Sequence, residues 1–210
     1  MPSINNEEDA AVSCQHVLSD LSSDPATLDG VEAVLVCCYS QQPLVPALRS
    51  MFAKTGRSDI VVAGIFEASV ATCLQSINIG ESFGIVSTGE QWQGILNDAV
   101  AGILGTRNSS RYAGTETTAL NAVELHTTSE DEVDRRMKDA TKRLLERKAR
   151  AICLGCAGMA GMDQTVREAC IEFLGEEDGQ KIMIVDGVVS GVNYLQGLVR
   201  SNSIVLLNEA

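Results

Sequence analysis

Short apolar runs alternate with amphipathic stretches along the chain from residue 31 onward. The runs are rich in Val, Ile, Leu and Ala, and they predict strands at 31–39, 59–65, 83–88, 119–126, 150–156 and 181–188. The stretches between them predict helices at 43–54, 67–78, 90–104, 129–149, 162–174 and 189–200. Continuous apolar strands, each followed by a helix, are typical of parallel sheets that are buried on both faces. The pattern therefore predicts an α/β fold.

Three local signals refine this reading. Residues 1–30 are expected to form an acidic leader and one helix near Asp9 to Leu21. Residues 106–118, TRNSSRYAGTETT, are polar and contain Gly, Ser and Thr, so we expect a connection between two lobes there. Ser129 and Glu132 have the spacing of a capping box, which marks the start of the helix at 129–149.

A loose internal repeat links two distant parts of the chain. EAVLVCC (32–38) aligns with RAICLGC (150–156), and VVAGIFEASV (61–70) resembles IMIVDGVVSG (182–191). One explanation is that all βαβ units look alike in sequence. The other is that the chain forms two similar lobes, each of which delivers a cysteine to a shared cleft.

Composition and charge narrow the range of partners. The chain has 210 residues and a net charge of −12, which disfavours general binding to nucleic acid or to an anionic membrane and favours a small-molecule substrate. No apolar run approaches the roughly 20 residues that span a bilayer, and the acidic N-terminus is unlike a signal peptide. We therefore expect a cytoplasmic protein. The seven cysteines, an odd number lying mostly in apolar segments, are expected to be reduced thiols.

No sequence motif points to a metal or an organic cofactor. His16 and His126 have no partner at metal-ligand spacing, and the C-x-x-C formed by Cys153 and Cys156 lies in an apolar run with no second pair. The nearby glycines do not match a dinucleotide fingerprint or a phosphate-binding loop. We therefore expect no cofactor.

Cys38 and Cys156 each follow a predicted strand, at the edge where open parallel sheets bind ligands. Because side chains alternate along a strand, only one of Cys37 and Cys38 can face a cleft, and we expect Cys37 to be buried and turned away. Core positions are expected for the cysteines in helical patterns, Cys14, Cys73 and Cys170.

Two thiols in one cleft, without a cofactor, suit proton transfer at a carbon next to a carbonyl. One cysteine, as thiolate, would remove the proton, and the other, as thiol, would protonate the opposite face of the same carbon. The backbone N–H groups of Ala157 and Gly158 and the hydroxyls of Ser87 and Thr88 are candidates for stabilising the developing enolate.

These motifs resemble the aspartate/glutamate/hydantoin racemase superfamily, and within it the hydantoin and allantoin racemase branch with its fungal members. LVCCYSQQPLVPALR resembles the first cysteine motif and ICLGCAGM the second; GIFEAS (64–69), IVSTGEQW (85–92), YAGTETTALNAVELH (112–126) and VDGVVSGV (185–192) are similar as well. The resemblance implies that Cys38 and Cys156 are catalytic. It also implies substrate-binding positions at Ser40, Ser87, Thr88, Ala157, Gly158 and Glu67, although Glu67 could instead be an acid at a helix N-terminus.

The resemblance also implies an architecture: two pseudo-symmetric α/β lobes with mainly parallel sheets flanked by helices, the active site between them, and no cofactor. We place the lobes at residues 1–88 plus 189–210 and at residues 89–188. Members of the superfamily begin with a strand and an Asn-Pro-Asn motif that this sequence lacks, so we expect unpaired strand edges in the first lobe.

The reaction expected from the resemblance is racemisation of a 5-substituted hydantoin or of allantoin. An aspartate or glutamate racemase is the second interpretation, although Arg49, Arg57, Arg107 and Arg111 all lie in predicted helices or loops rather than at strand ends. A non-catalytic binding protein of the same fold is the third. A homo-oligomer is left open.

Overall fold

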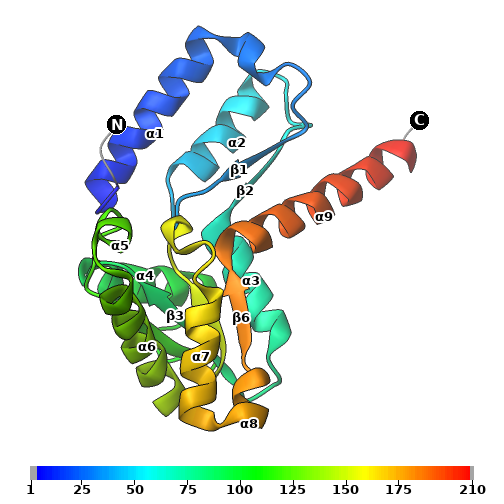
Figure 1. Ribbon diagram of the computed structural model, residues 1–210. Helices are drawn as coiled ribbons and strands as arrows, with labels where there is room; N and C mark the ends of the chain where they lie inside the picture. Colours follow the sequence, from blue (N-terminus) through cyan, green and yellow to red (C-terminus); the bar gives the residue numbers. More distant parts are fainter. Residues whose placement is uncertain (1–3, 209–210) are drawn as a thin grey trace.

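The computed structural model describes residues 4–208 and the side chains of residues 4–201, and within them six strands form two parallel sheets (Figure 1). In the first lobe, β1 (Ala33–Val36) pairs with β2 (Val61–Gly64). The second lobe contains β3 (Ser82–Ser87), β4 (Tyr112–Thr117), β5 (Ala149–Leu154) and β6 (Met183–Asp186) in the order β4-β3-β5-β6. The predicted α/β fold with parallel sheets flanked by helices is confirmed.

Most predicted helices are present with similar bounds. The helices are α1 (Glu7–Ser23), α2 (Leu44–Lys54), α3 (Ile65–Ser76), α4 (Gln91–Leu104), α5 (Glu124–Thr127), α6 (Glu130–Glu146), α7 (Asp163–Leu174), α8 (Glu176–Gln180) and α9 (Gly187–Asn208), with 3-10 turns η1 (Pro25–Leu28) and η2 (Ala157–Met159). Local signals account for several starts. Asn6 caps α1 by accepting a hydrogen bond from the backbone of Asp9, and Pro43 immediately precedes α2. Ser129 precedes α6 as predicted, but its side chain makes no capping bond.

Two helices cross between the lobes. Helix α3 follows β2 of the first lobe but packs on β5 and β6, whereas α9 follows β6 of the second lobe and packs on β1 and β2. The two copies of the repeat pair in a similar way: Ala33 pairs with Val61 in one sheet, and Ala151, its counterpart in the repeat, pairs with Met183 in the other, one residue after Ile182, the counterpart of Val61. Cys38 lies two residues after the end of β1, and Cys156 lies two residues after the end of β5.

The segment around residue 115 differs from the prediction. A strand was predicted at 119–126, but β4 lies at Tyr112–Thr117, inside the stretch expected to be a connection, and residues 124–127 are helical. The reason is that β4 is an edge strand, so a polar sequence is tolerated there. Its outer edge is covered by side chains: Gln93 donates to the Thr115 carbonyl and Asn97 accepts from the Thr115 N–H.

The predicted lobe boundary also differs from the sheet topology. A boundary after Thr88 places residues 82–87 in the first lobe, whereas β3 lies inside the second sheet, between β4 and β5. The chain returns to the first lobe with α9, which begins at Gly187, close to residue 189 where the first lobe was predicted to resume. All βαβ units have similar hydrophobic patterns, and only long-range pairing decides which sheet a strand joins.

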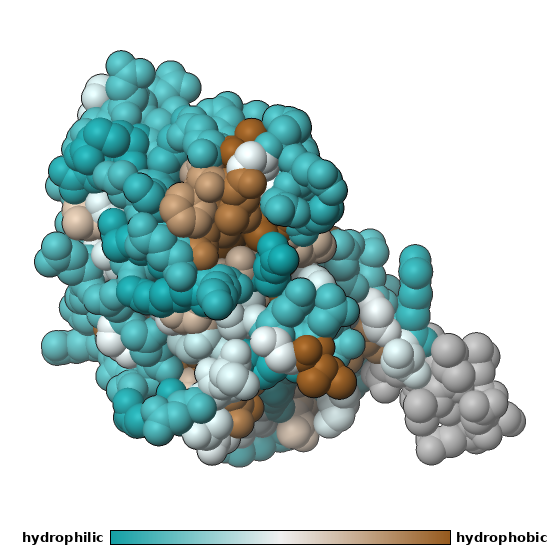
Figure 2. All heavy atoms as spheres, turned by 90° about the horizontal axis from the view of Figure 1, so that it is seen from below, coloured by the Kyte–Doolittle hydropathy of each residue, from teal (hydrophilic) through white to brown (hydrophobic). Residues whose placement is uncertain are grey.

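Large buried side chains hold each layer in place. Phe66, Phe83 and Ile85 belong to a cluster between α3 and the second sheet, and Met137 and Leu144 of α6 belong to a cluster on the other face of that sheet. The end of the second lobe that points away from the first is mostly hydrophilic around a compact apolar patch (Figure 2). Within the described residues, each helix is too short or too polar to cross a membrane.

Candidate active site

The loop after β1 carries Cys38 and Ser40. The Ser40 N–H donates to the Cys38 carbonyl at 3.1 Å and closes a tight turn, and the Ser40 hydroxyl oxygen lies 3.9 Å from Cys38 Sγ. Cys38 is half-buried and Ser40 is buried. Since α2 starts after Pro43, the turn is held between the end of a strand and the start of a helix. The loop therefore fixes the backbone of Cys38 while leaving its thiol partly accessible.

The loop after β5 carries Cys156, and Gly155 controls its path. The Gly155 N–H donates to the Val86 carbonyl at 2.7 Å, and the Ser87 hydroxyl donates to the Gly155 carbonyl at 2.9 Å. A Cβ at Gly155 would lie 2.5 Å from Ile85 Cγ2, so only glycine fits this close approach to β3. Cys156 then caps η2, and its Sγ accepts a hydrogen bond of 3.4 Å from the Gly158 N–H.

The thiols of Cys38 and Cys156 are close enough to interact electrostatically. Burial raises the pKa of the Cys156 thiol, the Gly158 N–H lowers it, and negative charge on Cys38 raises it again. Charge on Cys38 acts on Cys156 because the two loops meet at the facing edges of the two sheets (Figure 1). A thiolate at Cys38 therefore favours the protonated form of Cys156.

Ser87 and Thr88 are both buried at the end of β3. Ser87 is 1% exposed and its single hydroxyl hydrogen is donated to Gly155. Thr88 is buried too, and its carbonyl accepts from the Ala119 N–H at 3.1 Å. Both residues hold the ends of β3, β4 and β5 together. Ser87 thus supports the Cys156 loop, and it cannot donate to a substrate while its bond to Gly155 is kept.

Glu67 lies in the first turn of α3 and folds back over Gly64. A Cβ at Gly64 would lie 2.5 Å from Glu67 Oε2, and this oxygen is buried without a hydrogen-bond partner among the described residues. Burial raises the pKa of the Glu67 carboxyl, while its own backbone N–H and the Arg49 guanidinium lower it. The contact with its own N–H fits the interpretation of a helix N-terminal acid.

The remaining cysteines follow the prediction with one exception. Cys37 was expected to be buried, but it is exposed. The prediction was wrong because β1 ends at Val36, so Cys37 lies in the loop after the strand and not inside a strand that is buried on both faces. The cysteines that the structure buries in helices, as expected, are Cys14, Cys73 and Cys170.

Two residues near the thiols were not assigned to the site from the sequence. His126 of α5 was considered only as a metal ligand, but a Cβ at Gly158 would lie 3.5 Å from its Nε2 and 3.6 Å from Cys156 Sγ. Tyr39, between Cys38 and Ser40, extends into the core of the second lobe. The only sequence signal for a role of Tyr39 was its position inside the first cysteine motif, LVCCYSQQPLVPALR. Among residues 4–201, no cluster of three or more His, Cys, Asp or Glu side chains could hold a metal ion.

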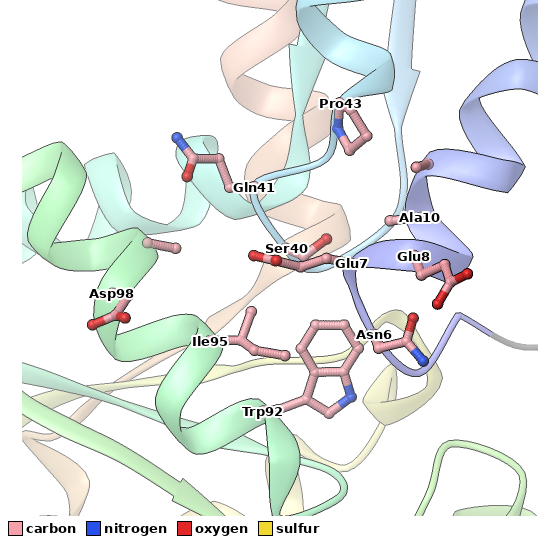
Figure 3. Close-up of a pocket in the computed structure, with 12 residues that line it drawn as sticks. Asn6, Glu7, Glu8, Ala10, Ser40, Gln41, Pro43, Trp92, Ile95 and Asp98 are labelled. Atoms are coloured by element: carbon pink, nitrogen blue, oxygen red, sulfur yellow. The ribbon is translucent and has the colours of Figure 1, made fainter.

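A cavity of about 860 Å³ lies beside the Cys38 loop, between α1, residues 40–43 and α4 (Figure 3). Ser40 and Gln41 line one side of it, Trp92 and Ile95 line another, and Glu7 enters from α1. Ser40 is the one predicted site residue in its lining. The cavity is therefore adjacent to the thiols rather than built around them.

Comparisons with known proteins agree with this geometry. A sequence profile of the Asp/Glu/Hydantoin racemase family matches residues 1–195. An uncharacterised protein of Schizosaccharomyces pombe is 35% identical over 173 residues, which are 82% of this chain and 65% of that protein. The hydantoin racemase of Pseudomonas sp. (strain NS671) is 27% identical over 171 residues, which are 81% of this chain and 59% of the racemase. The matched part thus spans less than two thirds of the length of both relatives.

A solved structure gives the same picture of the fold. Allantoin racemase from Klebsiella pneumoniae superimposes with a TM-score of 0.68 and 22% sequence identity, over 95% of this chain and 71% of that one. This likeness concerns the arrangement of the strands and helices.

Proposed function

The chain belongs to the Asp/Glu/Hydantoin racemase family, and from this premise we propose that it racemises a 5-substituted hydantoin or allantoin without a cofactor. The observation that carries the proposal is the equivalent placement of Cys38 and Cys156 after paired strands of two similar lobes. The relatives named hydantoin racemase and allantoin racemase support the substrate class. We further propose that the protein acts on this small molecule in the cytoplasm.

The proposed reaction is a proton transfer between two thiols. Cys38, as thiolate, removes the proton from the ring carbon, and the electron pair of the C–H bond moves into the neighbouring carbonyl to give an enolate. The Cys156 S–H then gives its proton to the opposite face of that carbon, and the carbonyl re-forms. After one turnover Cys38 is a thiol and Cys156 a thiolate, so the reverse reaction uses the same two groups with exchanged roles.

The protonation states fit these roles. Burial raises the pKa of Cys156, and negative charge on Cys38 raises it further, so Cys156 favours the thiol form that its role as proton donor requires. The Ala157 and Gly158 backbone lies beside Cys156, with the Gly158 N–H already bonded to its sulfur. A hydrogen bond to a sulfur stabilises the thiolate more than the thiol, which assists Cys156 as it loses its proton.

An aspartate or glutamate substrate is the second candidate, and it needs a cation for its free α-carboxylate. The arginines considered from the sequence are engaged elsewhere. Arg49 donates to the Val62 carbonyl, Arg111 to the Leu74 carbonyl and Arg57 to the Val31 carbonyl, while Arg107 pairs with Asp98. Because these arginines are already bonded to other protein groups, the contacts favour an uncharged ring as the substrate over a free amino acid.

The test follows the optical rotation of enantiopure allantoin, enantiopure 5-alkylhydantoins, L-aspartate and L-glutamate in deuterated water. We expect loss of rotation, with deuterium at the stereocentre, for a ring substrate. Loss of rotation with an amino acid alone would select the second candidate. No loss and no deuterium with any of them would refute the racemase proposal and favour a binding protein.

Cysteine variants connect the activity to the site. We expect Cys38→Ser and Cys156→Ser each to stop racemisation. Cys37→Ser is the matched control, because Cys37 is adjacent in sequence but exposed and outside the pair. An equal loss in the control variant would contradict the assignment.

A further inference from the structure

Tyr39 occupies an unusual position for a core residue, because it lies between Cys38 and Ser40 yet packs in the second lobe. It is 5% exposed. Its ring meets Phe66 of α3 edge to face, with centroids 5.5 Å apart and an interplanar angle of 80°. A Cβ at Gly187, where α9 begins, would lie 3.2 Å from the ring, so the absence of a side chain at Gly187 makes room for Tyr39. The Tyr39 ring, which extends from the Cys38 loop, is thus packed between α3 and the start of α9.

The Tyr39 hydroxyl joins the Cys38 loop to the strand that leads to Cys156. Tyr39 Oη lies 2.9 Å from Cys153 Sγ, and Ser69 Oγ lies 3.0 Å from Tyr39 Oη. Ser69 Oγ also lies 2.9 Å from the Phe66 carbonyl, which can only accept and therefore takes the single Ser69 hydrogen. The Tyr39 hydroxyl then donates either to Ser69, and accepts from the Cys153 thiol, or to the Cys153 sulfur itself. Cys153 belongs to β5, which ends at Leu154, immediately before the Cys156 loop. One chain of hydrogen bonds therefore spans α3, the loop after β1, and β5.

Burial makes this chain of bonds energetically important. Cys153 and Ser69 are fully buried, and a buried hydroxyl without a partner is costly. A phenylalanine would fill the same volume without a hydroxyl to satisfy, so packing alone does not require the oxygen of Tyr39. What the oxygen adds is a directional link between the loop after β1 and strand β5 of the second lobe.

We propose that Tyr39 is a positioning residue for racemisation: its hydrogen bond to Cys153 sets the separation and alignment of Cys38 and Cys156. This inference rests on the proposed function. A two-base reaction needs both sulfurs aligned with opposite faces of one carbon, and a misplacement of about 1 Å can reduce a rate about 100-fold. Tyr39 touches neither the substrate nor the reacting atoms, and it acts through the backbone of the adjacent Cys38.

The test separates alignment from general stability by comparing inversion with exchange. In deuterated water, a thiol that has removed the substrate proton can exchange it with solvent and return deuterium to the same face. This exchange with retention needs one aligned thiol, whereas inversion needs two. For Tyr39→Phe we expect the ratio of inversion to retentive exchange to fall about 10- to 100-fold. Cys153→Ala, which removes the other end of the link, should shift the ratio in the same direction.

Tyr112→Phe is the matched control. It deletes the same hydroxyl from a half-buried tyrosine, whose oxygen lies 2.9 Å from Asn97 Oδ1 in the second lobe, away from both thiol loops. We expect its ratio to equal that of the unaltered protein. A ratio within twofold of the unaltered value in Tyr39→Phe, or an equal fall in Tyr112→Phe, would overturn the proposal. If the unaltered protein neither inverts nor exchanges any substrate, the proposed function fails first and this inference falls with it.

Discussion

Gly155→Ala is the substitution that the structure predicts most directly, because Gly155 has no room for a side chain. An added Cβ would lie 2.5 Å from Ile85 Cγ2, 2.9 Å from the Val86 carbonyl oxygen and 3.2 Å from Ser87 Cβ. All three neighbours belong to β3, a buried central strand, and cannot move freely. Overpacking of this kind costs about 1–3 kcal/mol. A shift that also breaks the bond from Ser87 to the Gly155 carbonyl costs about 1 kcal/mol more.

The assay is urea unfolding of the variant beside the unaltered protein, with the free energy taken from the midpoint at equal slope. Gly94→Ala is the matched control, because Gly94 lies in α4 with nothing within 4 Å of an added Cβ. In a helix this change stabilises by up to about 1 kcal/mol. We expect opposite signs for the two variants. If Gly155→Ala unfolds at the same urea concentration as the unaltered protein, the close approach of the Cys156 loop to β3 is not as described.

The remaining predictions address titration, the sheet edge and packing. Because the pKa of Cys156 is raised, its alkylation rate, followed by peptide mass spectrometry, should still rise above pH of about 8.5, and Cys38→Ser should move that profile to lower pH. The same raised pKa makes a stability contribution that is complete below the usual thiol pKa and is lost as the pH rises through the folded-state value. Asn97→Ala removes the acceptor of a backbone N–H of β4, so urea unfolding should show a loss of about 1–3 kcal/mol. Leu144→Ala should lower the free energy of unfolding by about 2–5 kcal/mol. Gly84→Ala introduces a Cβ that clashes with Leu144, so it should be tolerated once Leu144 is replaced by Ala. Additive losses of stability in the double variant would contradict this.

The sequence predicted those elements that are determined locally. Helix α2 follows from a clear apolar stripe after Pro43, and β5 from a continuous apolar run, because both signals lie within a few residues. Strand β4 was missed because it is an edge strand. The outer backbone groups of its Thr115 are hydrogen-bonded by the side chains of Gln93 and Asn97 from helix α4. A pattern that depends on burial of both faces cannot reveal such a strand.

In the candidate site, too, some residues were predicted from local sequence signals, whereas others depend on contacts between distant segments. Cys38 and Cys156 were predicted from their places after two apolar runs and from the repeat, and the structure has a strand before each of them. The role of Ser87 was not predictable, because its hydroxyl is donated to Gly155, which is distant in sequence. His126 had no local partner either, and only the position of α5 brings it near Cys156. Interactions between distant segments determine these roles, and composition or spacing does not encode them.

For the proposed reaction, the two lobes must supply both symmetry and asymmetry. The symmetry comes from β1 and β5, each of which is followed two residues later by a cysteine, and the proposed reaction needs one thiol at each face of a planar intermediate. The asymmetry comes from the surroundings. Cys38 lies beside the Ser40 hydroxyl in a tight turn, whereas Cys156 caps a 3-10 turn and accepts the Gly158 N–H. In the proposed reaction, these unlike neighbours give the two cysteines different surroundings, while the exchange of their roles after each turnover still allows both enantiomers to react.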